Sequence, residues 1–428
     1  MTFQELYPLR ESLSQICLKK IEDYDVGKLG FRLLHIYYIK KSEKRETIWK
    51  HIAMILARCF TIRNKIEEHK EGKVICYCSR PMVTGRPDHL QNFLRVINLL
   101  ENKTVMVGTT IEGITLKNIK TLLLPFVWDM QLRKVVQDKY LRVILVRNIY
   151  SAYIDFLEYR NYEKKKSSKP VGLLLLEETI PSAMLLAEYF QKQGRKTAVL
   201  QHGLYAASEQ MKYYLSNWGC DYMLAYSKYS VDLLEEVGNY PGEIHILGMY
   251  QYIGQTLEER NIEKAERIGI FLDGFAIEKN LEMINIVVEA CKNTKRKIYI
   301  KLHPSSDEKE MEIYKQKIDM SNIVGIYSKK PVSIELEKNI DVMVCRNTTC
   351  FVEAVFQKIP AFIYNKESIY KGIKANIYFN SKEELSILFS KVEDGSIKER
   401  LEFLKIYLCG PTEPELTYSQ FFYELGWA

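Results

Sequence analysis

The chain contains 428 residues, of which 47% are hydrophobic and 27% are charged. This length predicts two domains of roughly 150–200 residues each, and the composition excludes a fibrous or wholly disordered protein. Every apolar run is shorter than the roughly 18 residues that a membrane-spanning helix needs, and the N-terminal residues lack the apolar core of a signal peptide. We therefore expect a cytoplasmic protein.

The net charge of +7 results from 61 basic and 54 acidic residues, and residues 1–70 carry a basic excess. Nucleic-acid binding usually requires a denser basic stripe, so we expect no nucleic-acid partner. An anionic substrate or a membrane surface fits this modest excess better, although a solvated helical face would carry the same charges.

Nine cysteines are scattered along the chain, which is typical of reduced thiols and not of a disulfide framework. Cys76 and Cys78 alternate within an apolar run, so both side chains should lie on one face of a strand. Because no second Cys or His pair follows at the spacing of a zinc site, we expect no metal.

Residues 1–70 are predicted to form a helical N-terminal extension. Within it, residues 47–69 place a set of apolar side chains on one side at helical spacing, namely Ile48, Ile52, Ile55, Leu56, Cys59 and Ile62. Such a helix either packs against the next domain or presents a surface to lipid or to an acceptor.

Residues 71–250 are predicted to form a first α/β domain with a parallel sheet, because short apolar runs alternate there with helical windows. The runs are residues 74–78, 105–107, 122–124, 143–146, 172–176, 197–200, 222–225 and 244–247. Residues 251–266 are polar and charged, and we interpret them as a linker.

A second series of apolar runs predicts a C-terminal domain over residues 267–410. The runs are residues 268–272, 298–302, 323–326, 341–345 and 361–364, with helical windows such as residues 280–291 and 348–357. Residues 411–428 are expected to form an aromatic helix that crosses back to the first domain. The predicted fold class is α/β, with two Rossmann-like, doubly wound domains whose strand ends face a cleft.

Gln201, His202 and Gly203 follow the predicted strand at residues 197–200. An imidazole titrates near neutral pH and can accept a proton from a hydroxyl group, and glycine permits close approach of the backbone. The three residues are therefore a candidate cleft motif with His202 as its base. Alternatively, His202 only bonds its own turn.

Two strand ends of the second domain carry groups that suit a phosphate. Lys301, His303 and Ser305 lie around the end of the run at residues 298–302. A lysine, an imidazole and a new helix start suit a diphosphate, although an ordinary capped turn would have the same sequence.

The second of these strand ends is the one after residues 341–345, where Asn347, Thr348 and Thr349 open a predicted helix. Hydroxyl and N–H groups at a helix start can hold a phosphate, and Glu353, one turn later, can accept bonds from ribose hydroxyls. The alternative is an N-cap followed by a surface glutamate.

Acidic residues follow two further predicted strands. Asp273 and Gly274 end the run at residues 268–272, and Asp273 is a candidate base or sugar ligand, although Asp-Gly is also common in turns. Glu177 and Glu178 end the run at residues 172–176. Paired carboxylates can act in acid–base chemistry, but acidic residues are also common in the first turn of a helix.

In order along the chain, these segments resemble the GT-B glycosyltransferases of bacterial surface polysaccharides. That neighbourhood includes the glycerophosphotransferases of wall teichoic acid, the capsule Kdo transferases and the HP-motif sialyltransferases. The resemblance covers roughly residues 170–370, through QHG, IHILGMYQY, KLHPSS and DVMVCRNTTCFVEAVFQKIPAFIYN.

The resemblance implies roles residue by residue. His202 matches the expected base of a Trp-His-Gly motif, here preceded by Gln201, and His303 in Lys-x-His-Pro matches a ligand of the donor phosphate. Thr348 and Thr349 match the last two hydroxyls of an Asp-Tyr-Ser-Ser motif. Two departures argue against a glycerophosphate donor: Arg346-Asn347 replace the first two residues of that motif, and Met249-Tyr250 replace a usual Pro-Arg.

The resemblance also implies the reaction. A nucleotide-activated sugar would bind the C-terminal domain, and His202, or else Asp273 or Glu178, would deprotonate a hydroxyl of a glycan or lipid-linked acceptor held by the N-terminal domain. Cationic side chains and a helix start would replace a metal, so we expect no metal and no cofactor. Peripheral contact with the inner face of the membrane is a further expectation.

Three alternatives remain open at this point. The first is a CMP-sugar or glycerophosphate transferase of the same fold. The second is a nucleotide-sugar 2-epimerase, and the third is a non-catalytic scaffold of a polysaccharide assembly complex.

Overall fold

The computed structural model describes the chain except residues 1–2, 22, 30–46, 63–64, 70–72, 79–86, 108–112, 115, 178–179, 202, 206–207, 209–212, 214–218, 238–239, 241, 256–259, 275, 304–305, 307, 328–338, 366–367, 369, 371–372 and 374. None of the helices in this described part combines the length and hydropathy required to span a bilayer.

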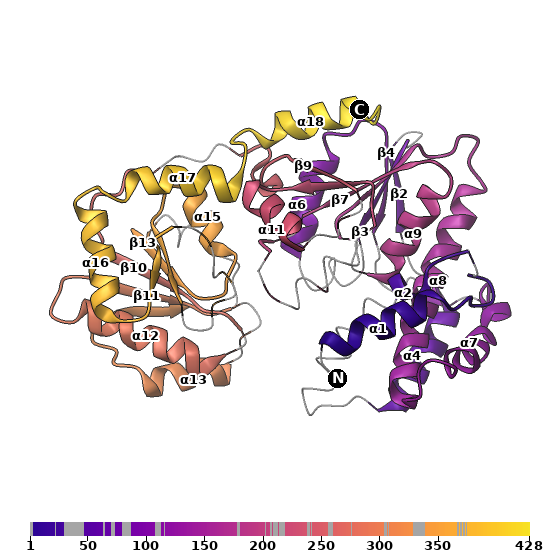
Figure 1. The fold of residues 1–428 in the computed structure, drawn as a ribbon, viewed down its shortest axis with the longest axis horizontal. Helices are drawn as coiled ribbons and strands as arrows, with labels where there is room; N and C mark the ends of the chain where they lie inside the picture. The colour runs from indigo at the N-terminus through magenta and orange to yellow at the C-terminus, as the bar shows by residue number, and fades with distance from the viewer. Residues whose placement is uncertain are drawn as a thin grey trace.

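The first half of the chain contains a helical layer and a large sheet (Figure 1). Its helices are α1 (Phe3–Ser14), α2 (Val26–Leu29), α4 (Ile48–Phe60), α6 (Pro87–Ile97), η2 (Ile119–Thr121), α7 (Leu124–Leu132), α8 (Lys139–Glu163), α9 (Pro181–Gln191), α11 (Lys228–Val237) and η3 (Tyr250–Tyr252). Its strands are β1 (Thr61–Ile62), β2 (Lys65–His69), β3 (Val74–Cys78), β4 (Lys103–Val107), β5 (Gly113–Ile114), β6 (Gly172–Leu175), β7 (Lys196–Leu200), β8 (Tyr222–Ala225) and β9 (Glu243–Ile246).

The second half contains a smaller sheet with its own helices. Its strands are β10 (Arg267–Phe271), β11 (Lys297–Lys301), β12 (Ile323–Tyr327), β13 (Val342–Cys345), β14 (Ala361–Tyr364) and β15 (Tyr378–Phe379). Its helices are α12 (Ile277–Cys291), α13 (Glu308–Lys317), α15 (Cys350–Phe356), α16 (Lys382–Glu393), α17 (Lys398–Cys409) and α18 (Pro414–Glu424).

Both sheets are doubly wound. The first has seven strands in the order β2-β4-β3-β6-β7-β8-β9, all parallel except β2, and the second has six parallel strands in the order β12-β11-β10-β13-β14-β15. The strand order reverses within each sheet, and ligands of such sheets bind outside the carboxyl ends of the strands at that switch point. The predicted α/β class with two Rossmann-like domains is confirmed.

Strand β3 illustrates why the first sheet is buried on both faces. Cys76 and Cys78 belong to one cluster of buried apolar residues, whereas Ile75 and Tyr77 belong to another. Because successive side chains of a strand point to opposite faces, the sheet separates two cores. The expectation that Cys76 and Cys78 share a face is confirmed.

Two predicted strands are wrong. Residues 122–124 lie around η2 and the start of α7, and residues 143–146 lie inside α8, a helix of 25 residues. This helix is buried on several sides, and a short apolar run does not by itself distinguish a buried helix from a buried strand. The Asp138 side chain, which accepts a bond from the Leu141 N–H at 3.1 Å, caps its start.

The predicted helix over residues 47–69 is wrong in its second half. Helix α4 ends at Phe60, and residues 65–69 form β2, which pairs antiparallel with β4 so that Ile66 lies opposite Met106. Pairing at the edge of the sheet therefore overrides the helical spacing of the sequence. The first half of the predicted helix corresponds to α4, which packs on α8 with Ile55 and Cys59 buried.

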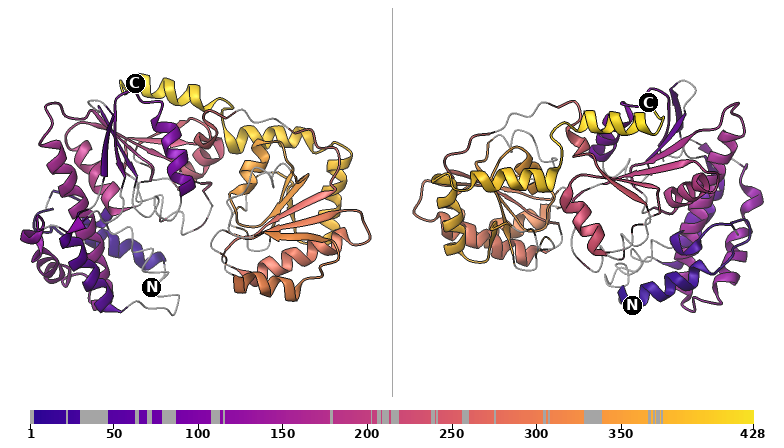
Figure 2. Two further views of the ribbon diagram at one scale, coloured as in Figure 1. Left: turned by 180° about the vertical axis from the view of Figure 1, so that it is seen from behind. Right: turned by 45° about the horizontal axis from the view of Figure 1, so that its top comes forward.

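The last helix, α18, lies along the first domain in every view (Figure 1; Figure 2). The Phe421 ring meets Tyr222 of β8 edge to face at 5.6 Å between centroids, and the Thr417 hydroxyl donates to the Leu247 carbonyl at 2.5 Å. The Trp427 indole occupies the space where a Cβ on Gly172 would lie, so only glycine fits there. The end of the chain thus packs on the first sheet.

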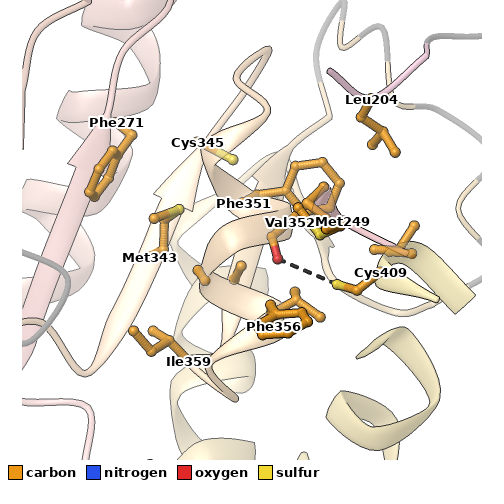
Figure 3. Packing of buried hydrophobic residues seen from close by; sticks show 14 of the residues in the cluster. Leu204, Met249, Phe271, Met343, Cys345, Phe351, Val352, Phe356, Ile359 and Cys409 are labelled. Carbon is orange, nitrogen blue, oxygen red and sulfur yellow. Dashed lines mark hydrogen bonds between the residues drawn. The ribbon is translucent and has the colours of Figure 1, made fainter. Parts of the chain in front are cut away.

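Buried apolar residues are also continuous between the two domains. Leu204 and Met249 of the first domain belong to one cluster with Phe351, Val352 and Cys409 of the second (Figure 3). The Cys409 thiol donates to the Val352 carbonyl at 3.6 Å. This cluster packs α15 against the segment that follows β9.

Candidate functional site

The turn after β7 in the first domain lies beside the turn after β13 in the second. A Cβ atom placed on Gly203 would lie 3.7 Å from the Thr349 Cγ2. Both turns stand at carboxyl ends of parallel strands, which is where ligands of doubly wound sheets bind. We call this junction the interdomain strand-end site and define it by Gln201, Gly203, Tyr226 and residues 346–353.

Gln201 organises the first-domain side of this site. Its side chain is fully buried, accepts a bond from the Tyr226 N–H at 2.8 Å and donates to the Gly203 carbonyl at 2.9 Å. Gly203 has a φ of +79°, a left-handed conformation that favours glycine. Gln201, expected as a cleft ligand, is instead a buried scaffold of the turn.

Tyr226 supports this turn from the carboxyl end of β8. Its hydroxyl accepts a bond from the Gly203 N–H at 3.3 Å, and its ring lies 5.5 Å from the Tyr250 ring. Burial, and to a smaller extent the charge of Glu353, raise the pKa of Tyr226 to about 12. Glu353 of α15 is therefore electrostatically coupled to the turn of the other domain.

Asp273 and Arg346 form a buried ion pair on the second-domain side. The Arg346 Nε and Nη2 donate to one oxygen of Asp273 at 2.9 and 2.6 Å, and the two side chains are 4% and 2% exposed. The Asn280 amide also holds the Asp273 carbonyl at 2.8 Å. This corrects the expected role of Asp273, because a carboxylate engaged in this way is not open to an acceptor hydroxyl; Gly274 beside it is half-buried.

Lys301, expected to neutralise a leaving phosphate directly, is also buried. Its side chain is 5% exposed, and its Nζ donates to the Leu302 carbonyl at 3.1 Å. Burial lowers the pKa of Lys301, with a smaller opposite effect from Cys350, the first residue of α15. The ammonium group is thus almost completely removed from solvent.

The other expected phosphate ligands are more accessible. His303, Asn347, Thr348 and Glu353 are half-buried, and Thr349 is exposed. The Thr348 hydroxyl accepts a bond from the Cys350 N–H at 3.3 Å, whereas Thr349, the N-cap residue of α15, makes no side-chain capping bond. Ser306 is buried, and its N–H donates to the His303 carbonyl at 2.9 Å, which closes the turn after β11.

Glu177 is 3% exposed, so it does not present its carboxylate to an acceptor as expected. Burial, followed by the charge of Glu177, raises the pKa of the Cys78 thiol, which places the carboxylate near the end of β3. The remaining expected site residues, His202, Glu178 and Ser305, lie outside the described residues. Among the described residues, no group of three or more His, Cys, Asp or Glu side chains is placed to hold a metal ion.

Two residues at these strand ends, Tyr226 and Arg346, have no role expected from the sequence, where Arg346 is only a departure from a motif. Tyr226 follows β8, which lies beside β7, the strand before Gln201. Arg346 follows β13, which lies beside β10, the strand before Asp273. A polar residue at the end of an adjacent parallel strand is the signal that would have identified both.

Comparison with solved structures supports the fold. The structure of S. aureus MnaA with UDP superposes with a TM-score of 0.52 and 13% identity, over 83% of this chain and 98% of that one. A UDP-N-acetylglucosamine 2-epimerase superposes with a TM-score of 0.51 and 11% identity, over 84% of this chain and 97% of that one. A glycosyltransferase from Rickettsia africae superposes with a TM-score of 0.50 and 12% identity, over 83% of this chain and 98% of that one.

No family model and no curated protein matches the sequence. The two doubly wound sheets and these superpositions together show that the chain has the two-domain GT-B fold.

Proposed function

We propose that this chain is a GT-B enzyme that transfers a sugar from a nucleotide-activated donor to a hydroxyl group of a bacterial surface polysaccharide. The fold supports a nucleotide-sugar substrate, since one structure of the same fold holds UDP and another is a glycosyltransferase. The order of the QHG, KLHP and RNTT segments supports a surface-polysaccharide enzyme.

The observation that carries the proposal is the approach of Gly203, which follows β7, to Thr349 at the start of α15. The two residues come from different domains, and a Cβ atom placed on Gly203 would lie at van der Waals distance from the Thr349 methyl group. A donor on the second domain and an acceptor on the first would therefore meet at these strand ends.

The described residues suggest a division of roles in the transfer. His303 and the hydroxyl of Thr349 would contact the leaving phosphate and stabilise its developing negative charge, and Glu353 would accept bonds from the ribose. Asp273 and Arg346 would hold the backbone from which Asn347 and Thr349 project. In this scheme Lys301 acts as a buried positive charge.

His202 would be the general base, because it stands between Gln201 and Gly203, both of which are fixed by bonds to Tyr226 or to each other. The imidazole would take the proton of the acceptor hydroxyl while the acceptor oxygen bonds to the anomeric carbon and the bond between that carbon and the phosphate oxygen breaks. The nucleotide would then leave as the anion.

The first test is which nucleotide raises the thermal unfolding temperature of the purified chain, because a ligand of the folded state stabilises it. We expect UDP, CMP or another nucleotide to raise that temperature in a concentration-dependent way. His303→Ala should weaken the effect, whereas His245→Ala, on strand β9 away from the site, should not. A chain that responds to no nucleotide would contradict the proposal.

The second test separates catalysis from binding. His202→Ala should lose turnover by about 10²–10⁴-fold and keep the nucleotide-induced stabilisation. Turnover near that of the wild type would remove His202 as the base. Loss of both turnover and stabilisation would instead make it a donor ligand.

A 2-epimerase is the second candidate, because a UDP-N-acetylglucosamine 2-epimerase shares the fold at a TM-score of 0.51. Incubation with UDP-N-acetylglucosamine and no acceptor distinguishes the two functions. An epimerase converts the sugar under these conditions, whereas a transferase leaves it unchanged until an acceptor hydroxyl is added. A scaffold would do neither, even with nucleotide bound.

A further inference from the structure

The η2–α7 segment carries a stripe of exposed, large apolar side chains. Its members are Leu116, Ile119, Leu123, Phe126 and Met130, which recur at steps of three and four residues. Their exposure ranges from 47% for Ile119 to 71% for Leu123. Phe126 and Met130 share one side of α7, Leu123 is the N-cap residue of that helix, Ile119 lies in η2 and Leu116 precedes η2. We call these five exposed residues the apolar stripe.

The opposite side of the same segment is already buried. Leu124, Trp128 and Leu132 pack in the first-domain core, and the Trp128 indole donates to the Lys19 carbonyl at 2.8 Å. Helix α7 is thus anchored on α8 by one apolar side, and a second apolar side faces outward. A surface helix normally has a polar outer face, so the outward stripe indicates a second contact.

Helix α4, next to η2, repeats this arrangement. Its buried side carries Ile55 and Cys59, and the Cys59 thiol donates to the Asn118 carbonyl at 3.3 Å, which joins α4 to η2. Its exposed residues include Trp49, which is 77% exposed, and Leu56. Tryptophan is enriched where proteins meet the headgroup region of a bilayer.

The charges beside the stripe are positive. Lys117, Lys120, Arg133 and Lys134 are all exposed. The one acidic residue between residues 116 and 134, Asp129, is paired with Arg133 at 2.9 Å and with Arg142 at 3.0 Å. An apolar stripe flanked by cations is complementary to an anionic lipid surface, whereas two copies facing each other would bring these cations together.

We propose that the η2–α7 stripe is a docking surface for a bilayer that contains acidic phospholipids, with the exposed Trp49 of the neighbouring helix α4 as a further contact. The stripe enters the boundary between headgroups and acyl chains, and the neighbouring lysines contact the lipid phosphates. Figures 1 and 2 show α7 at the end of the first domain remote from the second domain. Docking there leaves the interdomain strand-end site uncovered.

The test uses sedimentation of the full chain with vesicles of phosphatidylglycerol and, separately, of phosphatidylcholine. We expect binding to phosphatidylglycerol, and a loss of at least about tenfold in Leu123→Glu/Phe126→Glu, because these two side chains lose their contact with the bilayer. Both positions are exposed, so the fold should be retained. The matched control is Ile387→Glu/Ile406→Glu, which changes two exposed apolar residues of the second domain and should bind as the wild type does.

A second variant tests the electrostatic part. Lys117→Gln/Lys120→Gln should weaken binding to phosphatidylglycerol by roughly tenfold, with little change for phosphatidylcholine. The proposal is overturned if the wild type binds neither vesicle or if Leu123→Glu/Phe126→Glu binds as tightly as the control. It is also overturned if the wild type is a dimer that this variant converts to a monomer, because the stripe would then bind a second copy. These outcomes do not depend on nucleotide binding, which tests the proposed function separately.

Discussion

The strands β10 and β13 are joined at both ends by an arginine and an aspartate, but the surroundings of the two pairs differ. At the amino ends, Arg267 donates to Asp341 at 2.6 Å, and the Arg267 side chain is 39% exposed. At the carboxyl ends, Arg346 donates to Asp273 at the same distance, with both side chains almost completely buried. An arginine–aspartate pair is thus partly solvated at the amino ends of these strands, whereas the pair at the carboxyl ends is removed from water.

The difference matters because burial of an ion pair removes two charges from water at a cost of several kcal/mol per ion. A partly solvated pair like Arg267–Asp341 can also connect two strands, at a lower cost. Stability alone therefore does not account for the buried pair. Its place directly before Asn347 and the start of α15 indicates that Asp273 and Arg346 position the interdomain strand-end site.

The largest effect is expected from the removal of one partner of the buried pair. Arg346→Met leaves the Asp273 carboxylate buried without its cation and should lower the free energy of unfolding by about 3–5 kcal/mol. Arg267→Met is the matched control and should cost about 1 kcal/mol or less, because its pair is partly solvated and Asp341 keeps Arg260 at 3.7 Å. Urea denaturation measures both values, and equal losses would remove the distinction between the two ends.

A smaller effect is expected at Gln201, the buried scaffold of the first-domain turn. Gln201→Leu removes the partners of the Tyr226 N–H and the Gly203 carbonyl and should lower the free energy of unfolding by about 1–3 kcal/mol. Turnover should fall as well, because the turn that carries His202 loses its support. Gln137→Leu, at an exposed position, is the control and should change stability by less than about 0.5 kcal/mol.

The third prediction separates positioning from stability at the carboxyl ends. Asp273→Leu/Arg346→Met replaces both charges with apolar groups, so the free energy of unfolding should return close to the wild-type value. Nucleotide affinity, measured by calorimetry, should still fall by about tenfold, because Asn347 and Thr349 lose the support of the pair. Arg267→Met/Asp341→Leu should keep the wild-type affinity. An unchanged affinity in the first variant would assign the buried pair to the fold alone.

Much of the fold could be predicted because the strands buried on both faces leave continuous apolar runs, as in residues 222–225 and 361–364. The misassigned segments are those in which the local sequence pattern does not match the structure. Residues 143–146 are apolar because α8 is surrounded by other helices, and residues 65–69 are charged although they pair with β4. Neither the burial of a whole helix nor pairing at a sheet edge is encoded in local periodicity.

The sequence predicts which strand ends face each other, but not the surroundings of the charged groups there. Strand ends are readable, and a Cβ atom on Gly203 would lie beside Thr349 of the other domain. Whether a charged group at a strand end faces solvent depends on the neighbouring strand. Asp273 is taken up by Arg346, which lies 73 residues away in the sequence, and only the order of the strands brings them together.

The smallest effect concerns β11, which has a lysine at each end in the same contrasting surroundings. Lys297 at the amino end is exposed, whereas Lys301 at the carboxyl end is buried, and burial lowers the pKa of Lys301. An unfolded chain restores the ordinary lysine pKa, so in the alkaline range between the two pKa values the unfolded state binds more protons than the folded state. The contribution of Lys301 to the free energy of unfolding should therefore rise with pH across that range.

Lys301→Met removes this contribution, and the difference between the two proteins isolates it from the other groups that titrate at alkaline pH. The free energy of unfolding of the wild type minus that of Lys301→Met should be constant below the folded-state pKa of Lys301. It should then increase with pH until the ordinary lysine pKa of about 10.4 is reached. If the free energy of unfolding of the wild type minus that of Lys301→Met falls with pH, the fold stabilises the ammonium group at the carboxyl end of β11. The buried surroundings of this strand end would then not oppose its charge.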